Sequence, residues 1–200
     1  SDLRRQRQMC IRDRDLIILT KSLAKNSAWY SWLNDKENTN YTRQGYFPNT
    51  RKNQIKYFEN NITDKKNLMR NHINKERIQL GIVTKKTNKF VGVISLYNFH
   101  FIERSRSVSI LIDKKAKLKN SLLVYKEAQF LLIDHAFKKL NIRRIEAGAS
   151  SKQLAELAKK LFGFEIEGVA REKEFIDGRY TDMYHLGLLK SCLLYTSDAA

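Results

Sequence analysis

The sequence contains few of the residues that cross-link small secreted domains or interrupt secondary structure. Its 200 residues include two cysteines, Cys10 and Cys192, and a single proline, Pro48. The cysteines lie near opposite ends of the chain, so they provide neither a disulfide framework nor a cysteine metal motif. No apolar run approaches the roughly 18 residues of a membrane-spanning helix, and no signal peptide opens the sequence. We therefore expect a cytoplasmic protein with no metal ion and no membrane partner.

Acidic residues are also scarce, since 21 of them face 38 basic residues and leave a net charge of +17. This charge favours an anionic partner such as nucleic acid, a ribosome or a phosphorylated cofactor. The alternative is the composition of a low-GC genome, because Lys, Asn and Ile are abundant together. Basic residues are spread along the whole chain, which disfavours a nucleic-acid partner. With 42% hydrophobic and 30% charged residues, and with no repeat or linker, the chain suits one globular domain.

Both ends of the chain lack a pattern that joins them to the rest. Residues 1–14 are hydrophilic and rich in arginine, and residues 192–200 have no periodicity. We expect both segments to be non-native or disordered extensions that resemble translated adapter sequence. For the N-terminal segment, an RNA-binding arm is the alternative. The expected domain spans residues 15–191.

The central stretch combines a strand, a cationic loop and a long helix. Residues 107–113 are aliphatic and β-branched, which is typical of a buried strand. The loop 114–121 contains four lysines and no acidic residue. The apolar stripe of a helix follows, and Asn120 or Ser121 can cap its first N–H groups. Because free N–H groups and the helix dipole attract anions, we predict a phosphate site at this loop.

The remaining periodicities predict further elements. Expected strands cover residues 16–19, 77–85, 90–96, 108–112, 142–148, 167–175 and 180–189. Expected helices cover residues 27–33, 51–61, 121–140 and 153–161. Thr50 can cap the second helix, and Leu154, Leu157 and Leu161 mark the apolar side of the last one, which Gly163 would end in a left-handed conformation. Asp177-Gly178 between two alternating runs predicts a hairpin.

Several groups of residues occur in an order that resembles a known family. They are WLND at 32–35, GVISL at 92–96, EA at 127–128 with HAF at 135–137, GFEIEG at 163–168 and DGRYTD at 177–182. Over residues 15–189 the chain resembles the GNAT acetyltransferase superfamily, in the branch of ribosomal-protein and aminosugar N-acetyltransferases. The resemblance implies a single α/β (α+β) domain with a mixed, mostly antiparallel twisted sheet, flanking helices and splayed central strands.

The resemblance also implies acetyl-CoA as donor and a primary amine as acceptor, either a small amine or aminosugar or a protein N-terminus. It places the pantetheine arm against the backbone of the strand that holds Ile110, Leu111 and Ile112. The candidate phosphate-binding residues follow in the loop and the helix start: Lys117, Lys119, Asn120, Ser121 and Leu122. An N–H group of the strand could polarise the thioester carbonyl.

The chain also departs from the family pattern. Residues 113–127 contain no glycine, although glycine lets a backbone approach a pyrophosphate closely. Lys152 and Ala155 stand where the family often has Asn and Ser, residues 158–160 offer no tyrosine to protonate a thiolate, and Ser107 replaces an acidic residue. These departures favour an alternative function, that of a catalytically impaired, basic GNAT-like scaffold associated with RNA or ribosomes.

Catalytic candidates lie in the connection that leads into the cofactor strand. Acetyl transfer needs a neutral amine, so a base or a water chain must remove a proton. His100 or Glu103 could be this base, and Tyr97 could orient the substrate or donate a proton. The alternatives are a solvated His100, a Glu103 paired with a neighbouring arginine, and a Tyr97 that only packs.

Overall fold

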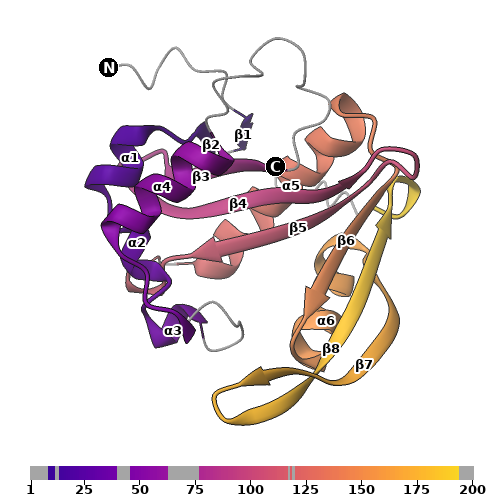
Figure 1. The fold of residues 1–200 in the computed structure, drawn as a ribbon. Helices are drawn as coiled ribbons and strands as arrows, with labels where there is room; N and C mark the ends of the chain where they lie inside the picture. The colour runs from indigo at the N-terminus through magenta and orange to yellow at the C-terminus, as the bar shows by residue number, and fades with distance from the viewer. Residues whose placement is uncertain are drawn as a thin grey trace.

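The computed structural model shows an eight-stranded sheet with helices on both faces (Figure 1). It describes residues 9–11, 14–39, 46–62, 77–116, 118 and 120–193. The strands are β1 (Met9–Ile11), β2 (Arg14–Ile18), β3 (Ile78–Thr84), β4 (Phe90–His100), β5 (Ser105–Ile112), β6 (Arg144–Ala149), β7 (Glu165–Ile176) and β8 (Arg179–Leu189). The helices are α1 (Lys21–Asn26), α2 (Trp29–Trp32), α3 (Lys36–Thr39), α4 (Arg51–Asn61), α5 (Ser121–Lys139) and α6 (Lys152–Phe162), with 3-10 turns η3 (Lys114–Ala116) and η4 (Lys190–Cys192).

The strand order is β1-β2-β3-β4-β5-β6-β8-β7. Neighbouring strands are antiparallel except β5 and β6, which run parallel. Parallel neighbours need a crossover connection, and α5 provides it. The predicted mixed, mostly antiparallel sheet flanked by helices is confirmed.

The helices divide between the two faces of the sheet. On one face, Trp29, Trp32 and Phe58 of α2 and α4 pack with Val93 of β4. On the other face, α5 and α6 pack on the larger core, which includes Ile94. Val93 and Ile94 belong to different clusters because successive side chains of a strand point to opposite faces. We call the two faces the α4 face and the α5 face, and Figure 1 shows α4 in front of the sheet and α5 behind it.

Local signals explain where the helices begin and end. The Thr50 hydroxyl accepts the N–H of Asn53 at 3.1 Å, and the Asn120 side chain accepts the N–H of Leu123 at 2.9 Å. Gly163 ends α6 with a φ of 85°, in the left-handed region that glycine adopts without strain. The predicted caps of α4, α5 and α6 are therefore confirmed.

The hairpin of β7 and β8 follows its predicted turn. Asp177 and Gly178 have φ values of 52° and 81°, and Ile176 pairs with Arg179 across the turn. Positive φ at both central residues is typical of a type I′ turn, whose twist matches that of the strands. The Asp-Gly pair therefore brings two long strands together at one edge of the sheet.

The buried stripe of α6 is displaced by one position from the predicted apolar side, although Leu161 of that side still packs, partly buried, against the core. Leu154 is 38% exposed, whereas the buried residues of the helix are Ala155, Ala158 and Phe162. These residues also follow the spacing of three and four that one helical stripe requires. Small alanine side chains let the helix approach the sheet, and Phe162 fills the space at its end. The prediction favoured the leucines because their side chains are larger than those of alanine.

Two short helices, the edge strand β1 and one strand extension were missed. The helices α1 and α3 are too short for a periodic signal, although the Thr20 hydroxyl caps α1 by accepting the N–H of Leu23 at 3.2 Å. Strand β4 continues to His100, so the predicted connection from residue 100 to 105 shrinks to a turn over residues 101–104. The catalytic candidate His100 therefore lies on a strand.

The boundary expected at residue 15 stays a proposal. Strand β1 pairs with β2 through Met9↔Leu16, Cys10↔Asp15 and Ile11↔Arg14, so a cut before residue 15 would remove an edge strand.

Among the described helices, none combines the length and hydrophobicity that a membrane crossing requires.

Our first testable prediction concerns Gly92 in β4, which pairs with Ile112 of β5. A Cβ at Gly92 would lie 2.6 Å from the Leu111 carbonyl oxygen, a backbone atom that cannot rotate away. Gly92→Ala should therefore lower the free energy of unfolding by about 1–3 kcal/mol. The matched control is Gly168→Ala in β7, where a Cβ would meet nothing within 4 Å. Thermal unfolding of both variants checks this, and equal Tm values would contradict it.

Candidate active site

The central feature of the candidate site is the divergence of β5 from β6. The two strands pair at only three positions, Ser105↔Arg144, Arg106↔Ile145 and Ser107↔Glu146. Beyond Ser107, β5 stays paired with β4 alone, and β6 continues beside β8. Figure 1 shows the gap between the two strands widening from this point. The splayed strands that the family resemblance implied are therefore present.

The diverging part of β5 carries a free backbone edge. In an antiparallel pair, every second residue directs its N–H and C=O away from the partner strand. The segment with Ile110, Leu111 and Ile112 thus offers hydrogen-bonding groups toward the gap. An extended chain with amide groups can bind such an edge as an added strand.

The N-terminus of α5 lies in the chain just beyond this edge. Ser121 and Leu122 belong to its first turn, whose N–H groups have no acceptor inside the helix. Both side chains are exposed, and Asn120 uses its side-chain oxygen for the N–H of Leu123. The helix start can therefore donate N–H groups to an anion. The other two predicted phosphate ligands, Lys117 and Lys119, lie outside the described residues.

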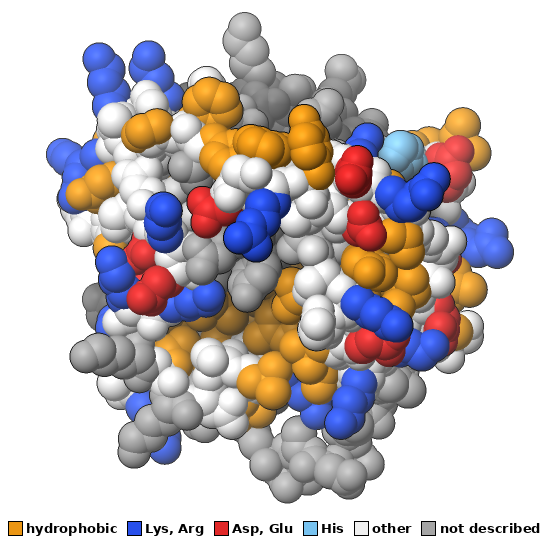
Figure 2. Space-filling model, turned by 90° about the horizontal axis from the view of Figure 1, so that it is seen from below, with side chains coloured by type: hydrophobic (Ala, Val, Ile, Leu, Met, Phe, Trp, Pro, Cys, Tyr) orange, Lys and Arg blue, Asp and Glu red, His pale blue; other side chains and the backbone are white. Residues whose placement is uncertain are grey.

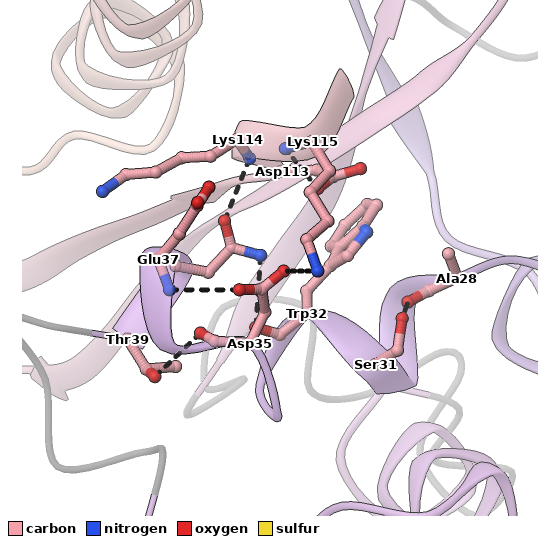
Figure 3. A network of polar contacts seen from close by, with 10 residues as sticks. Ala28, Ser31, Trp32, Asp35, Glu37, Thr39, Asp113, Lys114 and Lys115 are labelled. Carbon is pink, nitrogen blue, oxygen red and sulfur yellow. Dashed lines mark hydrogen bonds and ion pairs between the residues drawn. The ribbon is translucent and has the colours of Figure 1, made fainter. Parts of the chain in front are cut away.

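The turn between β5 and α5 is fixed to the α4 face of the molecule. Lys115 Nζ lies 2.7 Å from Asp35 Oδ2, and the N–H of Lys114 donates to Asn38 Oδ1 at 2.9 Å (Figure 3). The N–H of Lys115 donates to Asp113 Oδ1 at 3.0 Å, which closes the turn locally. Lys115 is one of the four lysines of the predicted phosphate loop, but in the structure its ammonium group binds Asp35.

Asp35 is the centre of this network. Its other carboxylate oxygen accepts the N–H of Glu37 at 3.0 Å, and its carbonyl oxygen accepts the Thr39 hydroxyl at 2.9 Å. The hydrogen bond from Lys115 lowers the pKa of the Asp35 carboxyl, and the same bond raises the pKa of Lys115. The stabilisation from the Asp35 carboxylate is lost only when the pH falls through its lowered pKa. The stabilisation from the Lys115 ammonium is lost only when the pH rises through its raised pKa. The pair therefore persists at least from about pH 5 to pH 10.

A row of side chains crosses the α4 face of the sheet where β5 and β6 diverge. Tyr97 of β4 pairs with Ser107 of β5, which pairs with Glu146 of β6. Tyr97 lies on the α4 face because the Arg77 guanidinium lies 5.1 Å from its ring centroid and donates to a tyrosine of α4. Glu146 lies on the same face because its neighbour Ile145 is in the core on the α5 face. The row thus runs from a cation and a phenol over β4 to a hydroxyl on β5 and a carboxylate on β6, and the last two groups flank the gap.

Two ion pairs determine the charge around Glu146. Arg144 Nε lies 3.1 Å from Glu146 Oε1, and the two terminal nitrogens of Arg144 donate to the Glu167 carboxylate. These hydrogen bonds, chiefly those to Glu167, raise the pKa of Arg144, and Arg144 lowers the pKa of Glu167. Gly187 provides the room, because a Cβ there would collide with both partners of the Arg144–Glu167 pair. Glu146 is thus held beside the gap by a permanent cation.

The predicted catalytic residues lie at different distances from the point where β5 and β6 diverge. Tyr97 lies in the row, opposite Ser107. His100 pairs with Ser105, two residues away from the divergence, and Glu103 lies in the exposed turn beyond it. Whether any of them acts in catalysis stays a proposal. Sequence reasoning missed Glu146, although the alternation of polar and apolar residues along 144–149 was a signal for it.

Seen from the open end of the gap, the molecular surface is hollowed between its two halves. Figure 2 shows this hollow, with hydrophobic side chains along part of its wall and charged side chains of both signs around it. Among the described residues, no group of three or more His, Cys, Asp or Glu side chains is placed to hold a metal ion. The free edge of β5 and the start of α5 fit a ligand that joins an amide chain to phosphate groups.

Comparison with known proteins shows the family to which this architecture belongs. The family model of the acetyltransferase (GNAT) domain matches residues 17–159. The chain belongs to the GNAT acetyltransferase family. A curated relative, the probable N-acetyltransferase YjcK of Bacillus subtilis (strain 168), is 30% identical over 115 residues, which are 57% of this chain and 62% of that protein. The matched segment therefore spans less than two thirds of that GNAT relative.

Solved structures of GNAT enzymes show the same fold. The spermidine N-acetyltransferase of Vibrio cholerae, in complex with CoA and spermine, has a TM-score of 0.73 and 19% identity, with 90% of this chain and 96% of that chain covered. The microcin C7 self-immunity acetyltransferase MccE, in complex with acetyl-CoA and AMP, has a TM-score of 0.70 and 16% identity, with 90% and 93% covered. The predicted family and fold are confirmed, and they agree with acetyl-CoA as the expected donor.

Our second prediction tests the network at Asp35. If it holds the GNAT cofactor turn in place, Asp35→Asn should weaken acetyl-CoA binding about fivefold, because the freed turn must be ordered again on binding. Lys115→Met should have the same effect, and the double variant should be no weaker than either single one. Calorimetric titration measures the affinities, and hydrogen exchange of the Lys114 amide reports the loosened turn.

The matched control for Asp35→Asn is Glu165→Gln. It removes the exposed ion pair of Lys159 with Glu165, which has the same length of 2.7 Å but lies between α6 and β7. The control should leave acetyl-CoA affinity unchanged. Equal affinities in all variants would show that the Asp35 network does not support the cofactor turn.

Proposed function

We propose that this chain is an N-acetyltransferase that moves an acetyl group from acetyl-CoA to a primary amine. The observation that carries the proposal is the position of the divergence. Strand β5 leaves β6 directly after Ser107, and its free edge leads through a fixed turn to the start of α5. Residues for binding a donor and residues for handling an amine thus meet at one point. A cytoplasmic location and a domain from residue 15 to residue 191 belong to the same proposal.

The donor site in this proposal follows the free edge and the helix start. The backbone of Ile110, Leu111 and Ile112 would hold the amides of the pantetheine arm. The phosphate groups would lie near Asn120, Ser121 and Leu122, and the lysines at 117 and 119 would add positive charge. When bound, acetyl-CoA supplies the acetyl group, whose bond to sulfur is exchanged for a bond to the amine nitrogen. The α5 dipole and free N–H groups favour this placement of the phosphates.

The amine site lies on the α4 face of the row. An amine is protonated near neutral pH, so a group of the protein or a water molecule must accept a proton before the nitrogen can react. Glu146 is adjacent to Ser107 at the divergence, and His100 lies two residues farther along. Because Arg144 binds Oε1 of Glu146, the other carboxylate oxygen, Oε2, can accept the proton directly or through water. His100 and Glu103 stay proposed alternatives, and the Tyr97 hydroxyl can orient the amine or return a proton to the thiolate.

Several kinds of acceptor fit this function. The spermidine enzyme of Vibrio cholerae acts on a polyamine, but at 19% identity the likeness supports the fold alone. A small amine, an aminosugar and a protein N-terminus all present the required primary amine. A different function, that of a catalytically impaired basic scaffold associated with RNA or ribosomes, is favoured by the absence of glycine from residues 113–127.

Our third prediction separates the enzyme from the scaffold. The full chain should bind acetyl-CoA in calorimetric titration and release free CoA in the presence of hexylamine, as measured with a thiol reagent. Raised salt should weaken the binding, because the expected phosphate contacts are partly exposed. A failure to bind acetyl-CoA at millimolar concentration would remove the enzyme from consideration and favour the scaffold.

Our fourth prediction identifies the base. Glu146→Gln, which keeps the size of the side chain and removes its charge, should lower kcat/KM by at least about tenfold. The loss should be greatest at the pH where the wild-type rate is highest, because a glutamine accepts no proton at any pH. His100→Ala and Glu103→Gln test the alternatives in the same assay. If no variant loses tenfold, water is the acceptor of the proton.

A further inference from the structure

The row on the α4 face contains an arginine that the proposed reaction does not use. Arg77 precedes β3 and is half-buried. Its guanidinium lies 5.1 Å from the ring centroid of Tyr97 and donates to the Tyr57 hydroxyl at 3.3 Å. Tyr57 in turn hydrogen-bonds the Gln79 side chain at 3.0 Å. The group is therefore held against two aromatic residues beside the candidate amine site.

The charge of Arg77 is not neutralised within the described structure. Among the ion pairs of the described residues, none includes Arg77. Arg144, at the other end of the row, contrasts with it because both carboxylates of Glu146 and Glu167 bind its guanidinium. A guanidinium has five N–H donors in a planar fork that matches a carboxylate or a phosphate. Among the described residues, this fork makes one hydrogen bond, to the Tyr57 hydroxyl.

The positions of Arg77 and Glu146 determine how long a molecule must be to contact both. Glu146 pairs with Ser107, Ser107 pairs with Tyr97, and Arg77 lies over Tyr97. Because neighbouring strands are about 4.8 Å apart, the backbones of Tyr97 and Glu146 are about 10 Å apart. A flexible molecule of several bonds can span that distance along the face, with a cationic end at Glu146 and an anionic end at Arg77.

We infer that the acceptor is an amine that also carries an anionic group, and that Arg77 binds this group. The inference rests on the proposed function and adds the acceptor class to it. A carboxylate or phosphate would gain paired hydrogen bonds from Arg77, while the Tyr57 hydroxyl donates its proton to Gln79. A polyamine of similar length would instead place its second ammonium beside the guanidinium, where like charges repel. The same arginine thus favours zwitterionic acceptors and rejects polycations.

The test compares three acceptors of one length with the full chain and acetyl-CoA. These are 6-aminohexanoate, hexylamine and 1,6-diaminohexane, which carry an anionic, a neutral and a cationic end. The wild-type kcat/KM should be on the order of tenfold higher for 6-aminohexanoate than for hexylamine, and lowest for the diamine. A further arm with 6-aminohexyl phosphate distinguishes a phosphate from a carboxylate as the preferred anion.

Variants of Arg77 locate the effect. Arg77→Met should abolish the preference for 6-aminohexanoate, so that the ratio of its kcat/KM to that of hexylamine, both measured on the same variant, falls to about one through a higher KM for 6-aminohexanoate. Arg77→Gln, which keeps a donor for Tyr57, gives a second uncharged variant if the methionine disturbs folding. Arg77→Lys should restore part of the preference, since a lysine keeps the charge but lacks the fork. Lys86→Met, which removes an exposed charge from the β3–β4 turn, should change nothing and so excludes an effect of net charge.

The outcomes separate the acceptor class from the activity. Acetylation of hexylamine with no preference for the anionic acceptors would overturn the inference and leave the acetyltransferase in place. A preference that survives Arg77→Met and Arg77→Gln would also overturn it, because another group would then bind the anion. If no amine is acetylated, calorimetric binding of 6-aminohexanoate decides the matter. Loss of that binding in the Arg77 variants supports the inference without the activity, and no difference overturns it.

Discussion

The three paired positions between β5 and β6 are the constraint on which the rest of the site depends. Two strands that pair so briefly must separate, and their separation leaves the second half of β5 with one unpaired edge. A free edge inside a sheet is normally a liability, because its N–H and C=O groups invite another strand. Here the edge leads to the capped start of α5, so one extended ligand can use both. The same point on the other strand carries Glu146, so donor and acceptor groups meet where pairing stops.

A gap of this kind needs contacts that fix its width, and they come from the N-terminal helices. Asp35 and Asn38 hold the turn after β5. On the other side of the gap, Tyr46 contacts the tip of the β7–β8 hairpin. Its hydroxyl donates to the Phe175 carbonyl oxygen and accepts the N–H of Asp177 at 3.1 Å. The segments around α3 therefore contact the turn after β5 on one side of the gap and the tip of the β7–β8 hairpin on the other. Residues distant in sequence from the central strands thus set the geometry of the site.

The sequence predicted what depends on local chemistry. Caps at Thr50 and Asn120, the left-handed Gly163 and the Asp177-Gly178 turn involve neighbours in the chain, so their signals are complete in a few residues. The pair of Asp35 with Lys115 joins parts of the chain that local patterns cannot relate. The role of Glu146 likewise depends on strand order and register, which set it beside Ser107. On α6, side-chain size pointed to Leu154, whereas close packing on the sheet selected the alanines.

The substitution at position 107 shows how the site can keep its chemistry while its residues move. The family resemblance implies an acidic residue near the start of the cofactor strand, and the chain has Ser107 there. The register places Glu146 directly beside this serine, on the same face. A carboxylate on β6 can therefore occupy the same part of the site as one on β5 would. The Arg144 guanidinium then holds that carboxylate in place, while Arg77 at the other end of the row has no carboxylate partner among the described residues. The face thus carries separated charges of opposite sign, and this polarity distinguishes between amines by what they carry at their far end.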